Sequence, residues 1–135
     1  TYSIDFDGVD DYINCGSDSS IDDIFDGGGS ISAWVYNNSG DLGNGEFIAH
    51  KSSGGGWYLQ LADQDGTLCE IRFRQRWDGS GGVSAYWDSS KSLNLSQWNH
   101  VAVTYNSSST SAPVKLTISK NSQSASLPCE ATSGL

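Results

Sequence analysis

The sequence predicts an all-β fold, an antiparallel sandwich of two packed sheets, and three observations support this prediction. Short apolar runs recur along the 135 residues, and clusters of Gly, Ser, Asn and Asp separate them, as expected of strands joined by turns. No window of about 11–18 residues repeats its apolar positions with the period of a helix. Two stretches, residues 30–36 and 98–105, are rich in β-branched and aromatic residues and carry no charge, which favours strands.

Residues 98–105 form the most strand-like stretch of the chain. On an extended backbone their side chains alternate between two faces. Because neither face carries a charge, we expect a central strand that is covered on both sides. By the same argument Trp34, Trp98 and His100 are expected in the core.

The other elements follow from local patterns. Residues 1–6 and 11–15 are expected to form a hairpin around the Asp7-Gly8 turn signal. Residues 16–29 are acidic and rich in glycine, so we expect a loop with one helical turn, whose apolar residues tuck under the sheet. Further strands are predicted over residues 46–51, 57–61, 68–77, 83–87, 112–120 and 124–129. We treat residues 1–135 as a single domain, since this length suits one hydrophobic core.

Residues 68–77 show the clearest one-sided alternation. Their apolar side chains point to one face, and the other face carries a row of three arginines, Arg72, Arg74 and Arg76. One interpretation is a solvated outer face with cross-strand ion pairs. The other is a row of guanidinium groups in a ligand groove, suited to carboxylate or sulfate groups.

Four stretches together resemble a known family. They read IDFDGVDDYI (residues 4–13), SISAWV (residues 30–35), the segment 48–61, and QWNHVAVTY (residues 97–105). In this order and spacing they resemble the laminin-G-like and pentraxin-like branch of the concanavalin A-like lectin and glucanase superfamily. The resemblance implies an antiparallel jelly-roll β-sandwich, in a module of a secreted or surface protein of a cell or virion that binds glycans or proteins.

Two departures from this family matter. Family members continue with several strands after the one that corresponds to residues 98–105, whereas this sequence stops at Leu135. The last strands are therefore expected to be lacking, replaced by a short closing segment over residues 124–135, or supplied by a second copy in a homodimer. The loop at residues 51–56 lacks the carboxamide and carboxylate side chains that bind calcium in pentraxin-like members, so that site is not transferred to this chain.

Several function classes are disfavoured by composition. A formal net charge of −9 argues against nucleic acid as a partner, and no apolar run approaches the roughly 20 residues of a membrane helix, so we expect no membrane insertion. Hydrolases of the superfamily carry a Glu-x-Asp-x-x-Glu pattern, and the three glutamates, Glu46, Glu70 and Glu130, do not form one. With His50 interpreted as a strand-end residue, we expect no catalytic residues and no enzyme activity.

Acidic residues supply a candidate metal site. Asp7 and Asp11, with Asp10 beside them, surround a tight turn, and such turns gather the oxygen ligands that Ca²⁺ prefers. One structural Ca²⁺ is therefore a candidate cofactor, and the alternative is that these aspartates only form the turn. A weaker cluster comprises Asp18, Asp22, Asp23 and Asp26. The three cysteines, Cys15, Cys69 and Cys129, allow either one disulfide or three free thiols.

The predicted ligand-binding site combines aromatic residues at strand ends with the arginine row. Aromatic faces stack on sugar rings, and neighbouring polar groups bond the hydroxyls. The set comprises Trp57, Tyr58, Arg72, Arg74, Arg76, Trp77, Tyr86 and Trp87. The sequence therefore predicts a non-catalytic, lectin-like carbohydrate-binding module for a polysaccharide or other glycan, with acidic glycans as the class that the arginines suit. The alternative is a structural or protein-binding adhesion domain without glycan affinity.

Overall fold

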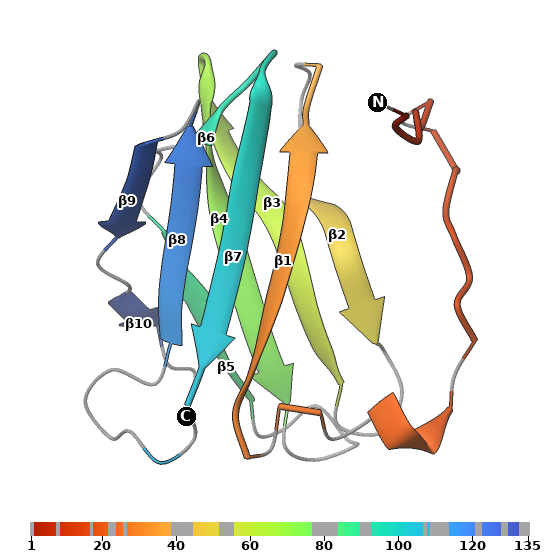
Figure 1. Cartoon of the computed structure of the whole chain (residues 1–135), viewed down its shortest axis with the longest axis vertical. Coiled ribbons are helices and arrows are strands. Elements are labelled where there is room, and N and C mark those ends of the chain that lie inside the picture. The colour runs from red at the N-terminus through yellow and green to blue at the C-terminus, as the bar shows by residue number, and fades with distance from the viewer. Residues whose placement is uncertain are drawn as a thin grey trace.

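Two antiparallel sheets pack face to face in a computed structural model of the chain (Figure 1). The structure describes residues 2–7, 9–16, 18–21, 24–25, 27–38, 45–51, 56–76, 84–89, 93–106, 108, 114–120, 123–127 and 130–132, with the backbone alone at 76, 84–87, 114–120, 123–127 and 130–132. The antiparallel all-β sandwich that the sequence predicts is confirmed. The expected single helical turn is a 3₁₀ turn, η1 (Ser19–Ile21).

Sheet A and sheet B divide the strands between them. Sheet A has the order β1-β7-β8-β9, and sheet B has the order β10-β5-β4-β3-β2, with the short β6 paired to β4. The strand bounds are β1 (Gly29–Tyr36), β2 (Glu46–Lys51), β3 (Trp57–Asp65), β4 (Leu68–Arg76), β5 (Ser84–Asp88), β6 (Leu93–Asn94), β7 (Trp98–Tyr105), β8 (Val114–Lys120), β9 (Gln123–Leu127) and β10 (Glu130–Thr132). The predicted strand at residues 124–129 corresponds to β9, a terminal strand of sheet A, whereas β10, a terminal strand of sheet B, begins after the predicted range.

The hydrophobic core lies between the sheets. Its most buried side chains come from alternate positions of β3, β4 and β7, and they include Leu59, Ile71, Phe73, Val101 and Val103. Phe25 joins them from the loop before β1 and is only 1% exposed. The prediction that the apolar residues of this loop tuck under the sheet is therefore confirmed for Phe25 and wrong for Ile24, which is exposed. Alternation along β1, β4 and β7 therefore sorts core positions from outer positions, as a two-layer sandwich requires.

The outer face of sheet A corrects one prediction. Strand β7 is central, since it pairs with β1 and β8, but it is not covered on both sides. The side chains of Trp34 and Trp98 are 62% and 46% exposed, and His100 is half-buried beside the Trp34 ring rather than in the core. The prediction failed because the absence of charged residues from a sheet face does not mean that the face is buried. In the described part of the chain, no third layer packs on the outer face of sheet A.

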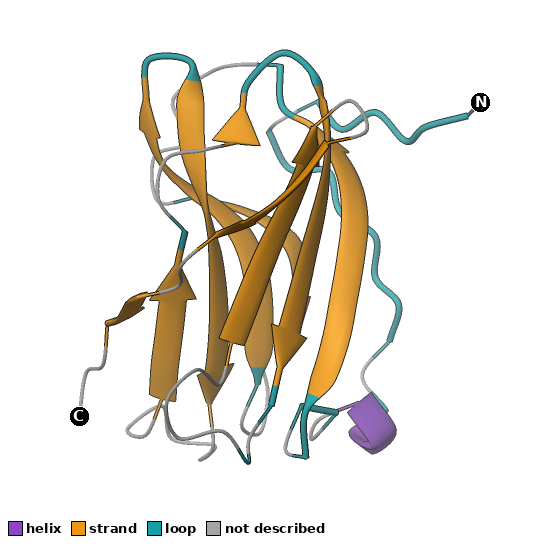
Figure 2. Cartoon of the chain, turned by 60° about the vertical axis from the view of Figure 1, so that its left-hand side comes forward, coloured by secondary structure: helices purple, strands orange, loops and turns teal. Residues whose placement is uncertain are grey.

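The predicted N-terminal hairpin is also wrong within the described residues. Residues 2–7 and 9–16 contain no strand, and all of them are exposed. The turn between them does form, because the backbone N–H of Asp7 donates to the Asp11 carboxylate at 2.9 Å and that of Val9 donates to the Asp7 carboxylate at 2.8 Å. Hydrogen bonds to the aspartate side chains fix the conformation of the turn itself, but the described residues before and after the turn pair with no strand. They form an extended arm at the side of the sandwich (Figure 2).

Two smaller points complete the fold. Within the residues that the structure describes, no helix has the length and apolar character needed to cross a membrane. Cys15 is an exposed free thiol and Cys69 a buried one, while Cys129 lies outside the described residues.

Candidate functional site

One cross-strand row on sheet B brings together three of the eight predicted ligand-binding residues, Tyr58, Arg74 and Tyr86. Backbone pairing aligns His50 of β2 with Tyr58 of β3, Tyr58 with Arg74 of β4, and Arg74 with Tyr86 of β5. We call these four residues the sheet B row. Directly opposite residues on one face of an antiparallel pair lie close enough to interact, so the backbone register brings these four positions side by side across four strands.

Aromatic and cationic groups contact one another within the sheet B row. The Arg74 guanidinium carbon lies 5.9 Å from the centre of the half-buried Tyr58 ring, within reach of a cation–π attraction. Phe47 stacks on the His50 ring with centroids 4.5 Å apart, and its edge meets Tyr58 at 5.3 Å. The Phe47 side chain is itself 54% exposed. Phe47, which adjoins the sheet B row, therefore adds exposed apolar ring surface close to the Arg74 guanidinium group.

A second cross-strand row runs beside the first. It pairs Phe47 with Gln60, Gln60 with Arg72, and Arg72 with Asp88. Gln60 is buried although it is on the outer face, because Gly45 lies over its side-chain amide. Gly45 has a φ of 93°, and a Cβ atom at this position would collide with the Gln60 amide. This leaves the contact between Arg72 and Asp88 as the accessible polar part of the second row.

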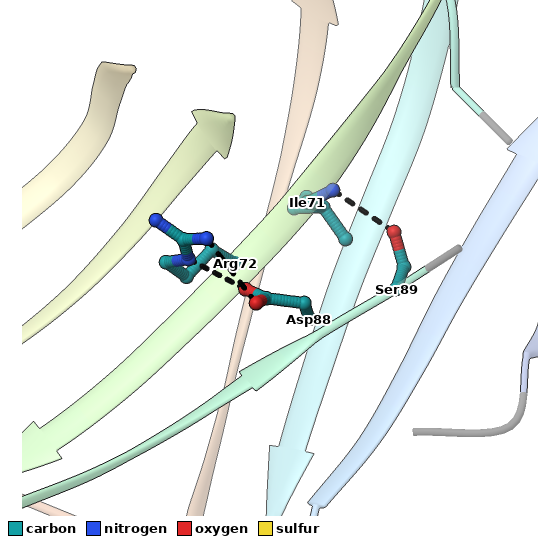
Figure 3. Close-up of polar contacts among 4 residues, drawn as sticks. All are labelled: Ile71, Arg72, Asp88 and Ser89. Carbon is teal, nitrogen blue, oxygen red and sulfur yellow. Dashed lines mark hydrogen bonds and ion pairs between the residues drawn. The ribbon is translucent and has the colours of Figure 1, made fainter. Parts of the chain in front are cut away.

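Arg72 and Asp88 form a bidentate ion pair (Figure 3). The Arg72 Nε and one terminal nitrogen donate to the two carboxylate oxygens at 2.5 and 3.2 Å. The hydrogen bond that Arg72 donates to the Asp88 carboxylate raises the pKa of Arg72 above its ordinary value. Next to this pair, the Ser89 hydroxyl accepts the backbone N–H of Ile71 at 2.9 Å, which ties the end of β5 to β4. For Arg72, the interpretation of a cross-strand ion pair on an outer face is confirmed.

Not every predicted site residue lies on this surface. Trp57 is corrected: it is 8% exposed, its ring meets Phe25 edge-on at 5.1 Å, and its indole N–H donates to the Ile21 carbonyl at 3.3 Å. It faces inward because it occupies the same register as the other core positions of β3. The backbone of Trp87 pairs with Phe73, a core position.

Two other predicted residues are placed less fully. Arg76 pairs through its backbone with Ser84, and Trp77 lies outside the described residues.

Three residues of the surface were missed by sequence reasoning: Phe47, His50 and Asp88. A register shift in β2 between Phe47 and Ala49 places Phe47 and His50 on one face although they are three positions apart. Simple alternation cannot reveal such a pair.

The aspartate cluster near the N-terminus is brought together as predicted. Each of Asp7, Asp10 and Asp11 offers a carboxylate oxygen, and these oxygens lie within 4.8 Å of one another. Three exposed carboxylates around one turn are a donor set that Ca²⁺ accepts, although Ca²⁺ takes roughly 6–8 oxygen ligands and water would complete the shell. Of the second cluster, Asp18 accepts the backbone N–H of Ser20 at 2.8 Å, and Asp22, Asp23 and Asp26 lie outside the described residues.

The fold and this surface define a class: an antiparallel, jelly-roll type β-sandwich with an aromatic and cationic row on one sheet. Comparison with protein families agrees, because the family model described as "Concanavalin A-like lectin/glucanases superfamily" matches residues 7–119. The chain therefore belongs to the concanavalin A-like lectin/glucanases superfamily, in its laminin-G-like branch. Searches of curated proteins and of solved structures return no significant match.

Proposed function

We propose that this domain is a non-catalytic carbohydrate-binding module and that the glycan lies on the sheet B row. The single observation that supports this is the alignment of His50, Tyr58, Arg74 and Tyr86 across four neighbouring strands. Ring surface supplies stacking area for a sugar, and the Arg74 guanidinium supplies donors for a carboxylate or for hydroxyls. As part of the same proposal, the domain belongs to a secreted or surface-exposed protein.

Binding of one glycan chain at such a row is expected to be weak. The surface is open and retains water, and ordering a flexible sugar costs entropy. A dissociation constant near 1 mM corresponds to only about 4 kcal/mol, which a stacked ring and one charge-assisted hydrogen bond can supply. The same weakness makes avidity on a repeating polysaccharide the natural mode of attachment.

The experiment is calorimetric or NMR titration with oligosaccharides of uronic acids and with neutral oligosaccharides of equal length. Arg74→Ala should weaken binding of the acidic ligand about tenfold or more, because a charge-assisted hydrogen bond contributes roughly 1.5–3 kcal/mol. Lys115→Ala is the charge-matched control, since β8 belongs to the other sheet, and it should leave affinity unchanged. The proposal fails if no glycan of either class binds at millimolar concentration, or if both variants weaken binding equally.

The second candidate is a structural or protein-binding adhesion domain, and one observation favours it. The outer face of sheet A exposes two aromatic cross-strand pairs, Tyr36 with Trp98 at 5.6 Å between centroids and Trp34 with His100 at 5.1 Å. Exposed apolar surface of this kind is typical of protein contacts. Absence of any glycan binding, together with binding to a protein partner that Trp34→Ala abolishes, would favour this candidate.

A further inference from the structure

Among the residues that the structure describes, the side of the sandwich bordered by β1 and β2 is only partly covered. These strands are the terminal strands of sheets A and B, and they border the same side of the molecule (Figure 1). Their core-facing residues Ile31, Ala33, Val35, Ile48 and Ala49 pack against the core but are only partly buried, whereas the core residues of β3, β4 and β7 are almost fully buried. An edge strand with apolar, half-covered side chains is a template for another strand.

The same chain carries a segment with the pattern of such a strand. In the N-terminal arm, Tyr2, Ile4 and Phe6 alternate with polar residues and are 104%, 66% and 48% exposed. Tyr12 and Ile13 are exposed as well. An extended backbone would place Tyr2, Ile4 and Phe6 on one face and Ser3 and Asp5 on the other, so that one face is apolar and the other solvated.

In a single chain the arm and the open side stay apart. The base of the arm is held near η1, where the Ile21 carbonyl accepts the Trp57 indole N–H and Phe25 inserts into the core. From there the arm runs along the β1–β2 side without joining either sheet, in both views (Figures 1 and 2). The described chain thus presents a half-covered core edge and an exposed segment whose sequence alternates between apolar and polar residues. A second copy can cover both reciprocally.

We propose that two copies of this chain form a symmetric dimer in which the N-terminal arm of each copy adds to the β1 edge of the other. Three aromatic residues of the arm, Tyr2, Phe6 and Tyr12, would each bury roughly 150–250 Å². If half of that area becomes covered, two arms and two receiving edges together bury roughly 900–1,500 Å², which reaches the lower range of stable, specific interfaces. A two-fold axis makes both contacts identical, as in exchange of a terminal element between protomers.

The test is light scattering and sedimentation of the full chain over a wide concentration range. The wild-type chain is expected to dimerise, and Ile4→Asp is expected to raise the dimer dissociation constant at least tenfold, because it places a charge on the buried face of the arm. Ser3→Asp adds the same charge on the solvated face and should change it less than twofold. Both residues belong to an arm without packed contacts to the core cluster, and circular dichroism should confirm that both variants fold.

Hydrogen exchange identifies the receiving edge. Amides of β1 and of the arm should gain protection together as the dimer forms, and both should lose it in Ile4→Asp. A chain that stays monomeric at all concentrations overturns the proposal, including the case in which its own arm becomes protected by folding back. A dimer that Ile4→Asp leaves intact overturns it as well. The outcome is independent of glycan binding, since the sheet B row contains no residue of the arm or of β1.

Discussion

The side chain of Phe25 is predicted to hold the base of the N-terminal arm to the core, although it lies in a loop. It is 1% exposed, and its ring meets the rings of Trp57 and Phe73 edge-on, each at 5.1 Å between centroids. Removing a buried Phe side chain costs about 3–5 kcal/mol through lost transfer energy and the cavity left behind. Edge-on ring pairs contribute about 0.5–1.5 kcal/mol each, so the two pairs account for roughly 1–3 kcal/mol of that total.

Equilibrium unfolding in urea measures this cost. Phe25→Ala should lower the free energy of unfolding by about 3–5 kcal/mol, and Phe25→Leu by roughly 1–3 kcal/mol, because the leucine keeps most of the apolar volume but loses both ring pairs. Ile24→Ala is the neighbouring control: Ile24 is exposed, so its cost should stay below about 1 kcal/mol. If Phe25→Ala costs no more than Ile24→Ala, the loop does not pack as described and the reasoning about the arm's anchor is refuted.

Three further predictions concern single groups. Burial raises the pKa of the Cys69 thiol from 9.0 to about 11. The unfolded chain therefore loses this proton at lower pH than the folded chain, and the free energy of unfolding should fall as pH rises from 9 to 11. Urea unfolding at each pH measures this decline, which Cys69→Ala should lack. Added Ca²⁺ should raise the melting temperature relative to chelator in the wild-type chain, and an equal rise in Asp11→Asn would contradict a site at this turn. Trp34→Ala should change the free energy of unfolding by less than about 1 kcal/mol because its side chain is exposed, and a loss above about 3 kcal/mol would place Trp34 in a core instead.

The sequence was sufficient to predict the fold class because alternation, turn residues and the absence of helical periodicity are local signals. It also predicted which face of β4 points inward, since Cys69, Ile71 and Phe73 are all buried. Alternation divides a strand into two faces but does not state whether the outer face is covered, and this is why Trp34 and Trp98 were misplaced. Burial of an outer face depends on a third layer, which is a property of the whole chain.

Cross-strand register explains most of what sequence reasoning missed in the candidate site. The ion pair of Arg72 with Asp88 exists because β4 and β5 align these two positions, and that alignment depends on how the connection between the strands closes. Likewise, Phe47 reaches the face of His50 and Tyr58 only through the register shift in β2. Tyr58 was predicted as a binding candidate because it is an aromatic residue at a strand end, and Arg74 because it belongs to a row of alternating arginines; the structure shows that the two are adjacent.

The ion pair next to the sheet B row leads to a last prediction, on ligand charge. Asp88 accepts hydrogen bonds from Arg72 through both carboxylate oxygens, which offsets one of the two guanidinium charges, those of Arg72 and Arg74, at the proposed glycan site. Asp88→Asn removes the carboxylate charge while keeping a hydrogen-bond acceptor for Arg72.

Because a partly exposed charge pair contributes up to about 1 kcal/mol, this variant should tighten binding of a uronic-acid oligosaccharide roughly two- to fivefold at low salt. Affinity for a neutral oligosaccharide of the same length should not change, since no ligand charge responds to the extra cation. The gain should shrink in high salt, because ions screen charges beyond roughly 3 Å at 1 M. An equal gain in affinity for both ligands would mean that Asp88 acts by blocking the surface rather than by its charge. Weaker binding of the acidic ligand would mean that Arg72 does not contribute to the binding site.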